Sequence, residues 1–179
     1  MSEAADNLLQ SATQAQREKR LSDARNDLVA AIDLLRNENA SEQLADALRA
    51  LGELERKLRD TESARTHYEE AVAIFRRYDD SLRLAHTVRH LGDVHHDAGQ
   101  VELAERCYAE ALALYRGHAN PPPLDLANAI RSMAVLKEET GEREQARRLW
   151  SEARELYAAV KVDAGVREST ARLERLAAS

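Results

Sequence analysis

Residues 84–115 of the chain read LAHTVRHLGDVHHDAGQVELAERCYAEALALY. Apolar residues recur in this stretch at intervals of three and four positions, as they do on one face of an α-helix, and Gly99 interrupts the pattern. Glycine readily adopts the backbone conformations that turns require. The stretch therefore predicts two amphipathic helices joined by a turn at Gly99.

The same pattern recurs on both sides of this stretch, at intervals of 40 and 42 residues. Five columns of small or bulky residues align between the repeats. The aligned sets are Leu51-Gly52, Leu91-Gly92 and Met133-Ala134; Ala24, Ala64, Ala104 and Ala146; Leu28, Tyr68, Tyr108 and Trp150; Ala31, Ala71, Ala111 and Ala153; and Leu35, Phe75, Tyr115 and Tyr157. Self-similarity at a fixed period of roughly 20–50 residues is the signature of a repeat architecture. The sequence therefore predicts an all-α protein built from repeated helix hairpins.

Two glycines lie in the middle of predicted helices, where glycine costs about 1 kcal/mol relative to alanine. A missing side chain at Gly52 or Gly92 would let the neighbouring helix approach closely. We expect Ala64 and Ala104 to be the opposing small residues, with the aromatic residue four positions later filling the space beyond the close contact.

This order of large, small and aromatic residues resembles the tetratricopeptide repeat. The residues that carry the resemblance are Leu48, Leu51, Gly52, Ala64, Tyr68 and Ala71, and then Val88, Leu91, Gly92, Ala104, Tyr108 and Ala111. The family's usual period is about 34 residues, so the longer period here resembles the repeats of kinesin light chain, with each helix extended by about one turn. The resemblance implies a right-handed superhelical α-solenoid of antiparallel helix hairpins.

The predicted organisation is a single domain over residues 1–179. It has four repeats, at about 5–40, 41–80, 81–122 and 123–162, and a connection at 163–165 that leads to a capping helix at 166–177. Three consecutive prolines at 121–123 end the third repeat, because proline lacks a backbone donor and cannot continue a helix. They account for the two extra residues in the longer interval.

Composition narrows the class of function. The chain has 26 Lys and Arg against 32 Asp and Glu, a net charge of −6, which argues against a general nucleic-acid binder. No apolar run approaches the length of a membrane span. Cys107 is the single cysteine, so an internal disulfide is excluded and a reducing compartment is favoured. We therefore expect a cytoplasmic protein that binds neither nucleic acid nor membrane.

The resemblance places the first helix of each repeat on a concave surface. Four positions of that helix, separated by three or four residues, share one face. The candidate partner-binding residues at these positions are Asp46, Arg49, Glu53, Arg56, His86, Arg89, Asp93, His96, Asn128, Arg131 and Glu138. The predicted groove is therefore polar and mixed in charge, and it could take an extended or helical segment of another protein.

An arginine occupies the same place in three consecutive repeats, at Arg49, Arg89 and Arg131. Guanidinium groups bind carboxylates with two parallel hydrogen bonds, so this ladder could engage an acidic peptide. The alternative is that the arginines pair internally with the acid four residues on, Glu53 for Arg49 and Asp93 for Arg89. Internal pairing and partner binding are compatible, since a partner can displace weak exposed ion pairs.

Three residues on one helix could in principle bind a metal ion. His86, His90 and Asp93 are spaced by four and then three residues, which can bring two imidazoles and a carboxylate together. No cysteine ligand or second-helix motif supports such a site, so we predict no metal and no cofactor and keep the trio as a candidate only. His95 stands where an aromatic residue is common, and we expect it to be packed between helices.

Catalytic motifs are not found in the sequence. It has no glycine-rich phosphate loop, no nucleophile elbow and no paired-histidine zinc signature. The prediction is a non-enzymatic scaffold that binds a peptide or helical segment of a partner protein. Two alternatives remain open: a self-association module that forms homo-oligomers, and a regulatory domain that senses a small ligand.

Overall fold

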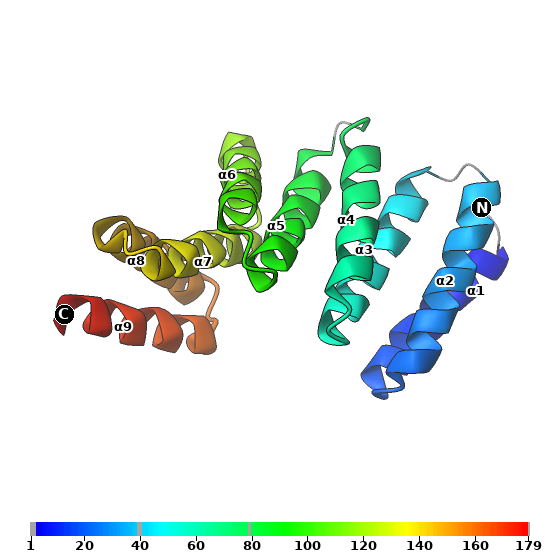
Figure 1. The fold of residues 1–179 in the computed structure, drawn as a ribbon, viewed down its shortest axis with the longest axis horizontal. Helices are drawn as coiled ribbons and strands as arrows, with labels where there is room; N and C mark the ends of the chain where they lie inside the picture. Colours follow the sequence, from blue (N-terminus) through cyan, green and yellow to red (C-terminus); the bar gives the residue numbers. More distant parts are fainter. Residues whose placement is uncertain (1–2, 39–40, 79, 179) are drawn as a thin grey trace. The chain divides into compact units, whose positions relative to one another are not determined.

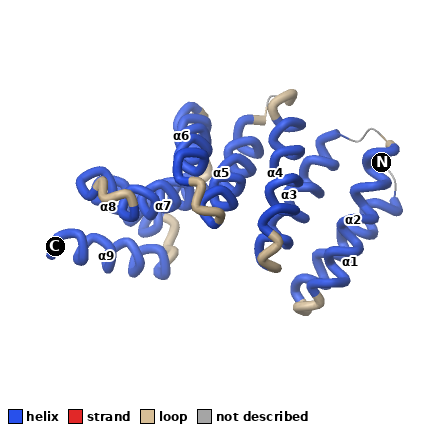
Figure 2. Tube along the Cα trace, viewed as in Figure 1, coloured by secondary structure: helices blue, strands red, loops and turns tan. Residues whose placement is uncertain are grey.

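The computed structural model describes residues 3–38, 41–78 and 80–178, and within these residues the chain forms nine α-helices and no strand (Figure 1; Figure 2). The helices are α1 (Glu3–Arg17), α2 (Leu21–Asn37), α3 (Ser41–Lys57), α4 (Thr61–Phe75), α5 (Ser81–Asp97), α6 (Val101–Gly117), α7 (Pro123–Glu139), α8 (Arg143–Ala159) and α9 (Asp163–Ala178). The predicted all-α helical repeat fold is confirmed.

The helices belong to two compact units, residues 1–80 with α1–α4 and residues 81–179 with α5–α9. In the first unit, α1 packs against α2 and α3 against α4, and α2 contacts α3. In the second unit, α5 packs against α6 and α7 against α8, while α6 contacts α7 and α8 contacts α9. Within each unit, successive hairpins therefore stack as repeats do. The single domain over 1–179 and its right-handed superhelix stay predictions, and each unit is described here by itself.

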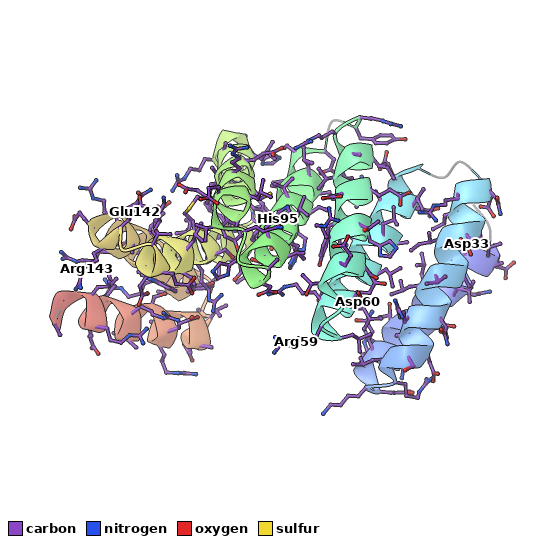
Figure 3. All side chains as sticks on the ribbon, viewed as in Figure 1. Asp33, Arg59, Asp60, His95, Glu142 and Arg143 are labelled. Carbon is purple, nitrogen blue, oxygen red and sulfur yellow. The ribbon has the colours of Figure 1, made fainter. Side chains whose placement is uncertain are left out.

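The four hairpin turns share one backbone conformation. A residue with positive φ follows each first helix, at Lys19 (61°), Arg59 (65°), Gly99 (71°) and Gly141 (81°). In the α3–α4 turn, where Figure 3 labels Arg59 and Asp60, the Asp60 amide donates to the Glu55 carbonyl (2.9 Å) and the Arg59 amide donates to the Arg56 carbonyl (3.1 Å). The same two bonds close the other three turns, and they satisfy carbonyls that the helix end would otherwise leave unpaired.

Bulky aromatic residues of the second helices fill the hairpin cores. Tyr68 and Phe75 are fully buried in the first unit, and Tyr108, Tyr115 and Trp150 are buried in the second. Burial of each aromatic side chain removes a large apolar surface from water, which is the main favourable contribution to folding. These aromatic side chains occupy the space between the two helices of a hairpin. The polar residues of each first helix therefore lie together on another part of that helix.

Glycines in the first helices meet aromatic rings. A Cβ added at Gly52 would lie 3.1 Å from Cδ2 of Tyr68, and one at Gly92 would lie 2.7 Å from Cε1 of Tyr108. The close approach of neighbouring helices is as predicted, but the nearest atoms belong to the tyrosine rings and not to Ala64 or Ala104.

The last helix is longer than predicted, because α9 begins at Asp163 and not at residue 166. Its first turn contains Gly165, where an added Cβ would lie 2.5 Å from Cδ2 of Tyr157 in α8. The Asp-Ala-Gly run reads as a connection in the sequence, since aspartate and glycine are common in turns. Here the glycine instead lets the start of α9 lie directly on the tyrosine ring.

Candidate functional site

The predicted partner-binding residues form polar stripes on three first helices. The α3 stripe consists of Asp46, Arg49, Glu53 and Arg56, the α5 stripe of His86, Arg89, Asp93 and His96, and the α7 stripe of Asn128, Arg131 and Glu138. All of these side chains are half-buried except that of Arg89, which is buried. The α3 stripe lies in the first unit, and the other two lie in the second.

The α3 stripe holds its charges in local ion pairs. Arg49 Nη2 lies 3.5 Å from Asp46 Oδ1, three residues earlier on the same helix, and Lys57 Nζ lies 2.7 Å from Glu53 Oε1. Arg49 thus has an acidic neighbour on its own helix, at a different spacing from the internal pairing considered in the sequence. Ion pairs at this degree of exposure contribute less than about 1 kcal/mol each.

Asp93 is the centre of a nearly buried polar network in the second unit. Its Oδ2 accepts a hydrogen bond from Arg89 Nη1 (3.0 Å) and lies 3.3 Å from His90 Nδ1. Its Oδ1 accepts from the hydroxyls of Tyr108 in α6 (3.0 Å) and Ser132 in α7 (3.2 Å). Only 10% of the Arg89 side chain and 12% of the Asp93 side chain are exposed, so this pair joins α5, α6 and α7 and leaves little of Arg89 for a partner.

Arg131 and Asn128 are each held by a residue outside the α7 stripe. Arg131 donates from Nε to Glu168 Oε2 (2.7 Å) and from Nη2 to Glu168 Oε1 (2.8 Å), a bidentate pair with α9. The Tyr157 hydroxyl donates to Asn128 Oδ1 (2.8 Å). Among the described residues, Arg131 Nη1 and the Asn128 amide nitrogen have no hydrogen-bond partner. Two donors on neighbouring turns of α7 therefore remain for a ligand.

Ionisation in this cluster follows from its contacts. The hydrogen bonds from Arg131 hold the pKa of the Glu168 carboxyl below its ordinary value, and Glu168 in turn raises the pKa of Arg131. Burial raises the pKa of the Tyr157 hydroxyl, so it remains a donor at neutral pH. The Arg131–Glu168 pair is therefore fully charged at neutral pH.

The Arg131–Glu168 pair should give a measurable pH dependence of stability. Because the pKa of Glu168 is depressed from 4.5 in the folded state, its contribution is present above that value and lost as the pH falls through the folded pKa. We expect the free energy of unfolding of the Glu168→Gln variant to lie below wild type by less than about 1 kcal/mol at pH 7. Chemical denaturation across a pH series should show this gap closing in acid, and a gap that persists there would contradict the assignment.

The remaining stripe residues also have partners. Glu138 accepts from Trp150 Nε1 (3.2 Å) and from Arg172 Nη1 of α9 (3.2 Å). His96 Nε2 donates to Glu139 Oε2 (2.6 Å), and His86 Nδ1 lies 3.9 Å from Asp125 Oδ1. The α5 and α7 stripes are thus close to neutral overall, because their charged side chains are paired within the unit.

The three candidate metal ligands, His86, His90 and Asp93, contact one another and other protein groups. The rings of His86 and His90 pack edge to face, with their centroids 4.7 Å apart, and both carboxylate oxygens of Asp93 bond protein donors. In the part of the chain that the structure describes, no group of three or more His, Cys, Asp or Glu side chains could hold a metal ion.

One further column of the first helices is polar and buried: Glu55, His95 and Lys137. Glu55 accepts from His67 Nδ1 (2.6 Å) and Arg25 Nη2 (3.3 Å), and His95 Nδ1 donates to Gln100 Oε1 (2.7 Å). Lys137 donates to Glu105 (2.5 Å) and Glu142 (2.7 Å), the latter labelled beside Arg143 in Figure 3. Burial opposes the charge on Lys137, but these two hydrogen bonds outweigh it and raise its pKa. His95 is packed as expected, and Glu55 and Lys137 each connect their hairpin to the preceding one.

Stacked hairpins with aromatic cores and polar first-helix stripes define a helical-repeat protein. Residues 43–117, from α3 through α6, match the family model of the tetratricopeptide repeat. Residues 43–117 are therefore tetratricopeptide repeats, as the sequence predicted. Such repeats generally mediate protein–protein interaction, and the fold is generally a non-catalytic scaffold.

A solved structure supports the same fold. The crystal structure of BtubC (BKLC) from P. vanneervenii, a kinesin light chain-like tetratricopeptide repeat protein, matches with a TM-score of 0.80 at 22% sequence identity. The match covers 88% of this chain and 64% of BtubC. No curated protein sequence matches the chain significantly. Within the described residues, none of the helices is both long and apolar enough to cross a membrane.

Sequence reasoning missed two residues that shape the α7 stripe, Tyr157 and Glu168. Tyr157 was assigned to the hairpin core alone, although its hydroxyl bonds Asn128. Glu168 stands in the α9 register where the first helices have Leu44, Leu84 and Leu126. Extending the repeat columns into the last helix would have revealed this exchange of leucine for glutamate.

Proposed function

We propose that this chain is a protein–protein interaction module in which the polar stripes bind a segment of a partner protein. The observation that carries the proposal is the pair of unused donors on α7, the Asn128 amide and Arg131 Nη1. Tyr157 fixes the Asn128 side chain, so little conformational entropy is lost at that residue when a ligand binds.

The chemistry of the donors indicates the kind of segment. An amide N–H suits the carbonyl oxygen of a peptide backbone, and a guanidinium suits a carboxylate. Asn128 and Arg131 are three residues apart on one helix, which places them on the same face about 5–6 Å from each other. A polypeptide segment with an acidic side chain next to an accessible backbone carbonyl satisfies both. In the first unit, half-buried Arg49 offers a second guanidinium of the same kind.

The arginines differ in what they can contribute. Arg89 is buried and engaged by Asp93 and His90, so we assign it to the framework that supports the stripe. Arg131, with 42% of its side chain exposed, is the residue that a partner carboxylate can reach. The acidic-segment proposal therefore rests on Arg131 in the second unit and on Arg49 in the first.

Substitution on the α7 stripe tests the proposal. Binding to a fluorescein-labelled peptide that alternates glutamate and serine should weaken in Arg131→Gln and in Asn128→Ala. We expect at least a roughly tenfold loss for Arg131→Gln, because a hydrogen bond to a charged group contributes about 1.5–3 kcal/mol. Fluorescence anisotropy titration gives the dissociation constants, and circular dichroism confirms that each variant is folded.

The matched control is Arg148→Gln, which removes the same charge from an exposed position on α8. This variant should bind the labelled peptide as wild type does. The same proteins, used as bait in extracts of the source cells, should recover partners with wild type and Arg148→Gln but not with Arg131→Gln. Equal affinities and identical recovered proteins for all variants would refute the proposed surface.

A further inference from the structure

The last helix is in register with the first helices of the repeats. Ser169 of α9 continues the column of Ala5, Ala45, Ala85 and Ala127, and all five residues are buried. Leu176 likewise continues the column of Ala12, Gly52, Gly92 and Ala134. The α9 helix therefore corresponds to the first helix of a repeat, and its side chains can be compared with the repeats column by column.

That comparison singles out Glu168. The residues in the same column of α3, α5 and α7 are Leu44, Leu84 and Leu126. Only α9 has a charged residue there, and its carboxylate forms the bidentate pair with Arg131 of α7. Glu168 thus makes with Arg131 the contact that a partner's carboxylate would make.

The pair is accessible to a competitor. Arg131 exposes 42% of its side chain and Glu168 exposes 31%, so water and a ligand can reach both. Glu168 occupies the Nε–Nη2 edge of the guanidinium, which leaves Nη1 as the free donor. A second carboxylate that approaches Arg131 is therefore repelled by the negative charge of Glu168, and it finds only Nη1 of the guanidinium available as a donor.

We propose that Glu168 is a built-in competitor for Arg131, which restricts the α7 stripe to acidic segments that can displace it. The inference rests on the proposed function of Arg131. The Glu168 side chain need only rotate away for a partner carboxylate to take both donors, so α9 itself can stay packed on α8. The affinity for acidic segments is then set by the difference between the partner's carboxylate and that of Glu168.

Neutralising Glu168 should strengthen binding. We expect Glu168→Gln to bind the labelled glutamate–serine peptide about two- to fivefold more tightly than wild type, the factor that corresponds to releasing a partly exposed ion pair. The matched control is Glu174→Gln, which removes an equal charge from an exposed position of the same helix and should change the affinity little. In an Arg131→Gln background, Glu168→Gln should give no further gain.

A second measurement reports on Arg131 without any partner. Phenylglyoxal modifies accessible guanidinium groups, and peptide mass spectrometry quantifies the modification at Arg131. The rate should rise in Glu168→Gln and stay at the wild-type value in Glu174→Gln.

The outcomes separate the two proposals. Equal peptide affinities for Glu168→Gln and Glu174→Gln, or weaker binding by Glu168→Gln, would overturn the competitor role and leave the partner-binding surface standing. Failure of every variant to bind the peptide would overturn both. Tighter binding that depends on Arg131, together with faster phenylglyoxal modification, supports the inference.

Discussion

Replacement of Asp93 by alanine is expected to lower the free energy of unfolding by about 3–5 kcal/mol, as the loss of one partner of a buried ion pair does. The carboxylate accepts from Arg89, Tyr108 and Ser132, which come from three helices of the second unit. Without it, the nearly buried guanidinium of Arg89 loses its counter-ion, and two hydroxyls lose their acceptor. Urea denaturation followed by circular dichroism measures the effect.

The repeat provides a control at the same position. Glu53 is the equivalent residue of α3, and its side chain is 40% exposed and pairs with Lys57. Glu53→Ala should cost less than about 1 kcal/mol, as is usual for exposed pairs. The double variant Asp93→Leu/Arg89→Met should recover much of the lost stability, because it removes both buried charges together. Equal losses for Asp93→Ala and Glu53→Ala would contradict the central role of Asp93.

The second large effect is expected at the glycines that face aromatic rings. An added methyl group would lie 2.5 Å from a ring carbon of Tyr157 at Gly165, 2.7 Å from Tyr108 at Gly92 and 3.1 Å from Tyr68 at Gly52. These rings are buried, and the hydroxyls of Tyr157 and Tyr108 are hydrogen-bonded. The rings therefore cannot move away easily, and overpacking of this kind costs about 1–3 kcal/mol.

Alanine substitution should therefore destabilise in the order Gly165, Gly92, Gly52. The gain in helix propensity, about 1 kcal/mol for alanine over glycine, should make Gly52→Ala close to neutral, while Gly165→Ala should lose about 2 kcal/mol or more. Thermal and urea unfolding of the three variants give the order. Limited proteolysis of Gly165→Ala should cut first near the start of α9, and equal stabilities of all three variants would show that the close contacts relax without cost.

The fold was predictable because its core residues repeat. Tyr68, Tyr108 and Trp150 recur at fixed intervals, so each repeat reinforces the assignment of the others. Gly165 and Glu168 occur once, in a helix that the alignment did not reach, and a single occurrence gives no period to detect. The boundary of α9 was wrong for the same reason.

The predicted stripe residues lie on α3, α5 and α7, but their pairing depends on three-dimensional contacts. The Arg89–Asp93 pair follows from four-residue spacing on one helix, and it was foreseen as the alternative to partner binding. The contact of Ser132 with Asp93 joins residues 39 positions apart. Such a contact depends on how one hairpin stacks on the next, which residue spacing alone does not determine.

The identical turns have a consequence for how such a chain can grow. Each first helix ends on the same two backbone hydrogen bonds, whether the left-handed residue is lysine, arginine or glycine. The geometry of the turn is thus set by main-chain hydrogen bonds. Any duplicated segment of about one period would therefore contain the same turn. Duplication or deletion of the gene segment that encodes one hairpin would therefore leave the remaining turns unchanged. The number of repeats could change during evolution without a new type of turn.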